Sequence, residues 1–250
     1  MSAAGPQVRV FPTAGAVSSE AAALLKEWAS EAVAAHGRFV IALSGGSTPE
    51  KLYRLLRNAG PSWLPYPKMD VFWSDERAVP PDDRNSNFRL AWNLWLAHIP
   101  LGEERVHRIK GEEGAATAAA DYENELRSLL GDLPRFDVIL LGVGSSDAHT
   151  ASLFPRSRAL RSRRLVEATR APFPPRDRIT LTLRVIHAAR HLLVLVTGGG
   201  KADAVRRAMQ KPPSSTVPAS VLLRPEATWL LDEAAASALR ARSAKRPSAE

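Results

Sequence analysis

Short apolar runs alternate along the chain with longer segments in which apolar and polar residues are mixed. Four of the runs are almost continuously hydrophobic, the pattern of strands buried on both faces of a sheet: Arg38–Leu43, Met69–Trp73, Phe136–Leu141 and His191–Val196. Weaker strand candidates are Gln7–Phe11 (an edge strand), Val106–Ile109, Leu165–Thr169, Ile179–Leu183 and Ala227–Leu231. This alternation predicts an α/β fold: a doubly wound, mostly parallel sheet with helices on both faces.

The mixed segments are predicted to be helices. They are Ser18–His36, Pro49–Asn58, Asn87–His98, Ala115–Leu130, a segment from Lys201 to Met209, and a short alanine-rich helix near the end. Ser18 or Ser19 is a candidate N-cap, Gly37 and Gly131 are candidate ends, and Pro49 occupies a favoured first position. We expect residues 1–238 to form one α/β catalytic domain and residues 239–250 to be a disordered basic tail.

A polar or glycine-rich turn follows each of the four buried strands. These turns are Ser44–Thr48, Ser74–Arg77, Gly142–Thr150 and Thr197–Lys201. In open parallel sheets, ligands bind beyond the carboxyl ends of the strands. We therefore expect the four turns to lie on one edge and to share one ligand.

The first turn, Ser44-Gly45-Gly46-Ser47-Thr48, suits an anionic ligand. Its glycines permit a close backbone approach, its hydroxyls can donate hydrogen bonds, and the following helix offers free N–H groups. The sequence is neither a Walker A loop nor the dinucleotide-binding G-x-G-x-x-G. A tight turn that only caps a helix would use the same residues.

Three cations accompany these turns. Arg77, in Asp75-Glu76-Arg77, offers a planar fork suited to phosphate or carboxylate, although a surface ion pair is an equal alternative. Lys201 opens a helix after three glycines, where an anionic ligand explains a positive charge better than stability does. Arg178 begins the run RITLTL. Asn85 and Asn87 are more simply interpreted as closing a loop by local hydrogen bonds.

Asp147 and His149 form the most specific pair, in Gly144-Ser145-Ser146-Asp147-Ala148-His149-Thr150. An aspartate two residues before a histidine can orient the imidazole, which can then take a proton from water near neutral pH. The nucleophile elbow G-x-S-x-G is absent, so Ser145, Ser146 and Ser152 do not indicate an acyl-serine mechanism.

Composition narrows the possible functions. There are no cysteines, which excludes disulfides, a thiolate nucleophile and cysteine-ligated metals. The net charge is +8, concentrated in RSRALRSRR (Arg156–Arg164) and RARSAKR (Arg240–Arg246). Neither run is interleaved with aromatic residues, so we expect no nucleic-acid partner. The first residues lack a signal-peptide layout and the apolar runs are strand-length, so we expect no membrane partner and a cytoplasmic protein. The sequence specifies no oligomeric state.

Five segments, in order, resemble the 6-phosphogluconolactonases of the pentose phosphate pathway. They are ALSGGSTPEKLY (Ala42–Tyr53), WSDERAVPPDDRNSNF (Trp73–Phe88), DAHTASLFP (Asp147–Pro155), RITLTL (Arg178–Leu183) and VTGGGKA (Val196–Ala202). The resemblance implies the sugar-phosphate isomerase/deaminase type of fold. It also implies hydrolysis of 6-phospho-D-glucono-1,5-lactone, a small phosphorylated sugar lactone, without metal or cofactor.

By the same resemblance, His149 would be the general base and Asp147 would orient it. Arg77 and Lys201 would bind the anionic substrate, Arg178 would add a basic contact, and Asp75 and the Ser44–Thr48 turn would line the pocket. The resemblance does not distinguish the cation that binds phosphate from the one that assists the oxyanion.

The chain departs from the family pattern Gly-x-Gly-x-Asp-Gly-His in two ways. One extra residue is present, which we place at Ser145 or Ser146, and Ala148 replaces a glycine. If the loop bulges, His149 keeps its place; if it does not, activity would fall. Two alternatives therefore remain: a glucosamine-6-phosphate deaminase or sugar-phosphate isomerase on the same fold, and a sugar-phosphate-binding protein with weakened catalysis.

Overall fold

The large sheet has six strands in the order β1-β9-β8-β5-β2-β3, and every neighbouring pair is parallel. The computed structural model describes residues 5–210 and 212–243. The strands are β1 (Gln7–Phe11), β2 (Phe39–Leu43), β3 (Met69–Trp73), β5 (Val138–Leu141), β8 (His191–Val196) and β9 (Ala227–Asp232). The chain winds outward from β2 to β3, then returns to β5 and continues in the other direction. The doubly wound topology is therefore confirmed, and the strand order reverses between β2 and β5.

A second, antiparallel sheet has three strands in the order β4-β7-β6. They are β4 (Asp75–Arg77), β6 (Val166–Arg170) and β7 (Asp177–Leu181). The sequence indicated the last two strands without their direction, and Asp75–Arg77 was expected to be part of a turn. Ser74 connects the sheets, because its N–H and hydroxyl donate to Leu43 O and its carbonyl accepts from Leu181 N.

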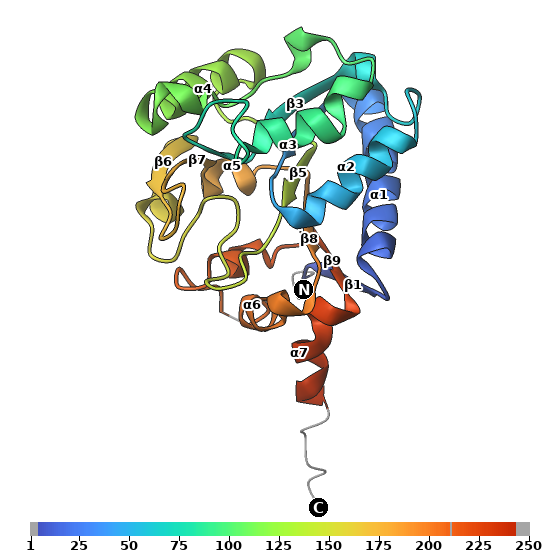
Figure 1. Ribbon diagram of the computed structural model, residues 1–250, viewed down its shortest axis with the longest axis vertical. Helices are drawn as coiled ribbons and strands as arrows, with labels where there is room; N and C mark the ends of the chain where they lie inside the picture. The colour runs from blue at the N-terminus through green and yellow to red at the C-terminus, as the bar shows by residue number, and fades with distance from the viewer. Residues whose placement is uncertain (1–4, 211, 244–250) are drawn as a thin grey trace, which may run out of the picture.

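Helices lie on both faces of the large sheet (Figure 1). The long helix α1 contacts β2, β8 and β9 and has α2 beside it, whereas α4 contacts the second sheet. The helices are α1 (Ala14–His36), α2 (Ser47–Asn58), α3 (Asn87–Leu94), α4 (Ala115–Leu130), the one-turn α5 (Leu183–Ile186), α6 (Ala202–Ala208) and α7 (Glu233–Ser243).

Two helices begin earlier than expected. Thr13, not Ser18 or Ser19, caps α1 and accepts from Ala16 N, while Ser18 is buried and its hydroxyl donates to Ala14 O. The helix α2 begins at Ser47, so Pro49 is its third residue. Proline is tolerated there because N–H groups of the first turn have no partner within the helix.

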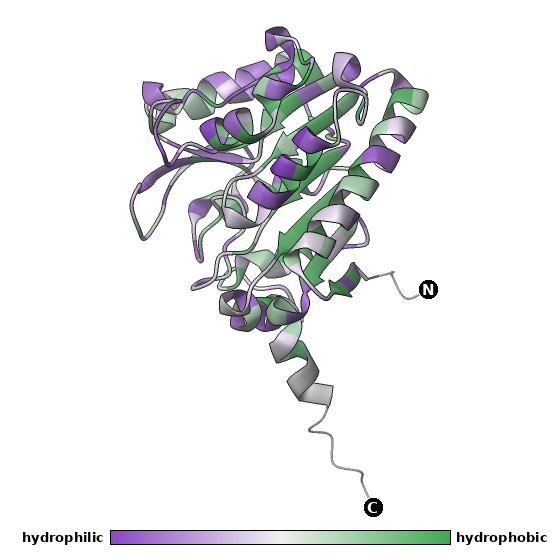
Figure 2. Cartoon of the chain, turned by 45° about the vertical axis from the view of Figure 1, so that its right-hand side comes forward, coloured by the Kyte–Doolittle hydropathy of each residue, from purple (hydrophilic) through white to green (hydrophobic). Residues whose placement is uncertain are grey.

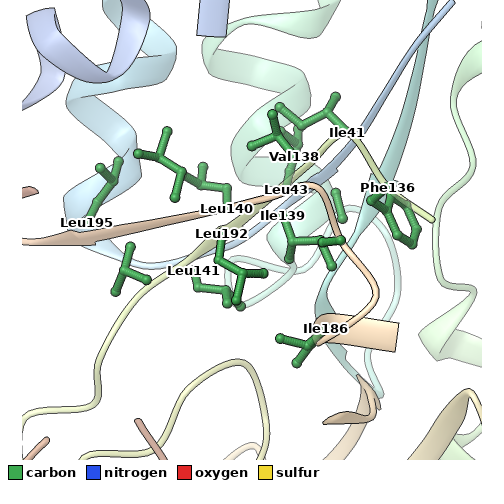
Figure 3. Close-up of a cluster of buried hydrophobic side chains, with 14 of the residues drawn as sticks. Ile41, Leu43, Phe136, Val138, Ile139, Leu140, Leu141, Ile186, Leu192 and Leu195 are labelled. Carbon is green, nitrogen blue, oxygen red and sulfur yellow. The ribbon is translucent and has the colours of Figure 1, made fainter. Parts of the chain in front are cut away.

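The core lies where β2, β5 and β8 meet. Their side chains point to both faces of the sheet and pack with Phe136 and Ile186 (Figure 3). Apart from His191 at the start of β8, these three strands are apolar, whereas the helices combine polar and apolar positions (Figure 2). Burial of these apolar side chains stabilises the sheet. The polar groups lie in the turns that follow the strands.

The outer edge of β3 is closed by side chains and a loop instead of another strand. Tyr122 of α4 donates its hydroxyl to Trp73 O and accepts from Trp73 N. The expected strand at Val106–Ile109 is wrong, because only a single bridge, Val71 to Val106, forms there. At the C-terminal end of the chain, the expected tail begins too early, because residues 239–243 belong to α7. Residues 244–250 lie outside the part of the chain that the structure describes.

Candidate active site

One cavity of about 430 Å³ lies at the carboxyl edge of the large sheet. The turns after β2, β3, β5 and β8 all contribute to its lining, as do β7 and the turn between β6 and β7. The two central contributors, β2 and β5, are the pair between which the strand order reverses. This is the position at which doubly wound sheets bind their ligands.

The glycine turn forms one wall of this cavity. Gly46 has a φ of 102°, a conformation that favours glycine, and it precedes α2 with no side chain capping the first N–H groups. A side chain at Gly45 would overlap Asn87, so this glycine permits the turn and Asn87 to lie against each other. Thr48 joins the turn to the end of β8 through a 3.2 Å hydrogen bond between its hydroxyl and that of Thr197.

Two arginines face the cavity from the second sheet. Arg77 and Arg178 are directly opposite each other in the β4–β7 ladder, and both line the cavity. Burial, together with the charge of Arg77, lowers the pKa of Arg178 to about 10. Like charges placed directly opposite in a ladder destabilise it. An anion between the two guanidinium groups would remove that cost.

Backbone carbonyls hold these arginines in place, and the buried Asp75 beside Arg77 makes its own hydrogen bonds. Arg77 Nη1 donates to Asn85 O over 2.5 Å and Arg178 Nε donates to Pro175 O over 2.7 Å. The buried Asp75 accepts from Ser152 Oγ at 2.6 Å and from Asn87 Nδ2 at 3.3 Å. Asp75 therefore connects β4, the strand that carries Arg77, to the loop that carries His149.

Glu76 points away from the cavity and organises the following loop. Its carboxylate accepts from the backbone N–H groups of Arg77, Asn87 and Phe88 and from the hydroxyl of Ser86. Burial raises its pKa even though these donors favour the ionised form. Glu76 thereby fixes the start of α3 next to the strand that carries Arg77.

His149 and Asp147 form a close pair. The distance from His149 Nδ1 to Asp147 Oδ1 is 2.6 Å, and the same oxygen accepts from the backbone N–H of His149 at 3.2 Å. Burial acts to raise the pKa of Asp147, but the hydrogen bond and charge of His149 outweigh it and the pKa is lowered. Ionised Asp147 selects the tautomer with the proton on Nδ1, which leaves Nε2 as the nitrogen able to accept one.

The loop that carries His149 is fixed from several sides. Gly144 N donates to His149 O, Ala148 N donates to Gly144 O, and Ala219 N donates to Ala148 O, all within 3.1 Å. Arg207 of α6 donates to Ser146 O over 2.8 Å. Ala148 has a φ of 53°, the left-handed conformation in which glycine is less strained. The loop therefore accommodates the extra residue that we placed at Ser145 or Ser146, and His149 still lines the cavity.

Lys201 reaches the cavity from the end of β8. Its Nζ donates to Val143 O over 2.7 Å. Burial lowers its pKa, and the nearby charge of Asp147 acts in the opposite direction. An anion bound in the cavity would compensate a buried ammonium group that here has a carbonyl as its partner.

The structure brings together almost every residue that the sequence singled out. All nine expected substrate-binding residues and His149 line the cavity, while Asp147 lies behind His149 and does not line it. The other five histidines lie outside the lining. Asn85 closes its loop as expected, with its N–H donating to Asp83 Oδ1.

Several lining residues were missed or assigned another role, among them Asn87, Ser152, Phe154 and Phe173. Asn87 was interpreted as a turn residue, although it contacts both Asp75 and the glycine turn. Ser145, Ser146 and Ser152, which the sequence suggests only as rejected nucleophiles, all line the cavity. Phe154 lies in the segment DAHTASLFP, which the resemblance singles out without giving this residue a role. Phe173 lies in a loop with no periodic signal, so only the tertiary structure reveals it.

Two features are absent from residues 5–210 and 212–243. No three His, Asp or Glu side chains gather there in a way that could hold a metal ion. No helix in that part of the chain has the length and apolar character needed to cross a membrane.

Comparison with known proteins gives a consistent answer. The family model of glucosamine-6-phosphate isomerases and 6-phosphogluconolactonase matches residues 12–231. A 6-phosphogluconolactonase of Nostoc sp. is 37% identical over 240 residues, covering 93% of this chain and 98% of the relative. The solved 6-phosphogluconolactonase from Trypanosoma cruzi has a TM-score of 0.83 and 30% identity, covering 94% of this chain and 97% of that one. A monomeric glucosamine-6-phosphate deaminase has a TM-score of 0.80 and 27% identity, with coverage of 93% and 99%. The chain belongs to the glucosamine-6-phosphate isomerase/6-phosphogluconolactonase family.

Proposed function

We propose that this protein hydrolyses 6-phospho-D-glucono-1,5-lactone to 6-phosphogluconate. The observation that carries the proposal is the His149–Asp147 pair, whose imidazole lines the same cavity as three cations and a glycine turn. The named relatives from Nostoc sp. and Trypanosoma cruzi support this substrate over other sugar phosphates.

We assign the phosphate and the lactone carbonyl of the substrate to two different groups of lining residues. The glycine turn, the start of α2 and the loop that leads to Lys201 are joined through Thr48 and Thr197. Free N–H groups at a helix start together with an ammonium group suit a phosphate. We place the substrate phosphate beside these groups and the lactone carbonyl near Arg77 and Arg178, where an oxyanion would be stabilised.

The proposed reaction needs one base. His149 Nε2 takes a proton from a water molecule, and the resulting hydroxide oxygen bonds to the lactone carbonyl carbon. The carbonyl oxygen becomes an oxyanion that Arg77 and Arg178 stabilise. When the carbonyl re-forms, the bond from that carbon to the ring oxygen breaks. The imidazolium then returns its proton to the ring oxygen, which becomes the hydroxyl of the open acid.

The test compares lactone hydrolysis by variants with the spontaneous rate. We expect His149→Ala to lose most of the acceleration, and Asp147→Asn to lose about 100-fold in kcat because the imidazole loses its ionised partner. Freshly prepared lactone is the substrate, and acid release is followed at constant pH. Binding of 6-phosphogluconate, measured by calorimetry, should remain largely intact in His149→Ala.

His98→Ala is the matched control. His98 is exposed, its Nε2 lies 3.0 Å from Asn93 O, and it is outside the cavity lining, so its loss should leave turnover unchanged. Full activity in His149→Ala would contradict the role assigned to this residue.

The deaminase neighbour makes glucosamine-6-phosphate deamination the second candidate. That reaction requires groups to open the sugar ring and to move protons at carbon. Release of ammonia from glucosamine 6-phosphate, without acceleration of lactone hydrolysis, would favour it. Tight binding of 6-phosphogluconate with neither activity would favour a sugar-phosphate-binding protein.

A further inference from the structure

The turn between β6 and β7 places a phenylalanine at the cavity. A hydrogen bond from Ala171 N to Arg176 O closes this turn over 2.7 Å. Phe173, between them, is 38% exposed and nevertheless lines the cavity. The ring of Phe173 is therefore not fully packed into the core, and part of its surface faces the cavity.

Phe173 belongs to a cluster of three rings that includes the imidazole of His149. Its centroid is 5.9 Å from that of His149 and 5.9 Å from that of Phe154, which it meets edge to face at 86°. Phe154 lies 4.8 Å from His149 and is buried. The imidazole is therefore contacted by one ring from the protein interior and by another from the surface.

The same phenylalanine contacts Arg178. The guanidinium carbon of Arg178 lies 5.7 Å from the centre of the Phe173 ring, within the range of cation–π attraction. Arg178 also donates to Pro175 O in the same turn. Phe173 thus touches two groups of the proposed reaction that come from different parts of the fold.

We propose that Phe173 is a positioning residue that holds the imidazole of His149 in its reactive orientation. Asp147 fixes one nitrogen of the ring through one hydrogen bond, which leaves the tilt of the ring to its packing against Phe154 and Phe173. This inference rests on the proposed lactone hydrolysis. A base displaced by about 1 Å can lose about 100-fold in rate, so loss of one packing surface should reduce turnover.

The experiment measures kcat and KM for lactone hydrolysis in Phe173→Ala, Phe173→Tyr and Phe173→Leu. We expect kcat about tenfold lower in Phe173→Ala with KM changed less than about twofold. Phe173→Tyr retains the ring and should restore kcat, whereas Phe173→Leu should restore it only in part. Arg176→Ala is the control, because Arg176 is exposed on the same turn and outside the cavity lining.

A purely structural role gives a different pattern. If Phe173 only stabilises the turn, Phe173→Ala will lower the melting temperature and leave kcat unchanged, and the inference is overturned. Equal loss of kcat in Arg176→Ala would overturn it as well. If the alanine variant does not fold, the tyrosine and leucine variants decide by the same comparison.

A second measurement does not depend on activity. The ring proton signals of His149, assigned by their loss in His149→Ala, should broaden in Phe173→Ala, an effect that loss of the phenyl ring current alone does not produce, and should not broaden in Arg176→Ala. Signals that do not broaden in Phe173→Ala would overturn the inference. A wild-type protein that does not accelerate lactone hydrolysis contradicts the proposed function, whereas an active wild type with an equally active Phe173→Ala contradicts only the role of Phe173.

Discussion

Gly144 is the residue that makes room for the His149–Asp147 pair. A Cβ at this position would overlap the imidazole of His149 and crowd the Asp147 carboxylate. The need is spatial, since Gly144 is not among the glycines with positive φ. The sequence shows a glycine at the strand end but cannot distinguish a tight turn from a close side-chain approach.

Gly144→Ala should therefore reduce kcat by about 100-fold, because the imidazole must move by about 1 Å or more. Thermal unfolding should change little, since the added methyl displaces a partly exposed side chain and not the core. Steady-state kinetics and a melting curve test this prediction.

Gly142→Ala is the matched control on the same strand exit. A Cβ there would meet only Leu195 O, at an ordinary 3.8 Å. Its loss of kcat should be much smaller than that of Gly144→Ala. Comparable losses in the two variants would show that the space around His149 is not the cause.

At the scale of elements, the sequence predicted the four buried strands and the turns that follow them. Those strands are continuous apolar runs, and parallel strands place their carboxyl ends on one edge. The second sheet was not foreseen as a separate unit, because Leu165–Thr169 and Ile179–Leu183 carry no sign of direction or partner. The start of α1 was placed too late, because Ser18, an expected cap, lies inside the helix and Thr13 caps it.

The loop between β4 and α3 depends on Glu76, which could not be recognised from the sequence. Its carboxylate accepts four hydrogen bonds from the loop and from the start of α3. We expect Glu76→Gln to lower the free energy of unfolding by about 1–3 kcal/mol, because an amide nitrogen would face N–H donors and leave them unpaired. Chemical denaturation measures this change.

Asp82→Asn provides the comparison for Glu76→Gln. Asp82 is exposed in the same loop, so the same chemical substitution should change the free energy of unfolding by less than about 0.5 kcal/mol. Equal effects of the two substitutions would contradict a specific role for Glu76.

At the scale of the whole molecule, charge favours an anionic substrate. The net charge is +8, and Arg77, Arg178 and Lys201 add a local concentration of positive charge at the cavity. Fields of this kind raise the rate of encounter with anions and are screened by salt.

We expect kcat/KM for the phosphorylated lactone to fall severalfold between about 50 and 500 mM salt, with kcat less affected. Glucono-1,5-lactone, which lacks the phosphate, is the control substrate and should show a much weaker dependence. An equal salt effect on both lactones would show that the field of the protein does not act through the phosphate.

The order of the large sheet also bears on how the chain is assembled during synthesis. The first strand, β1, pairs with the last, β9, so that Gln7 lies beside Thr228. The ribosome must therefore deliver β9 before β1 has a partner, whereas β2 and β3 can pair much earlier. Contacts so distant in sequence form slowly, because a long loop must close first. The N-terminal strand is the first part of the sheet to be made and among the last to join it.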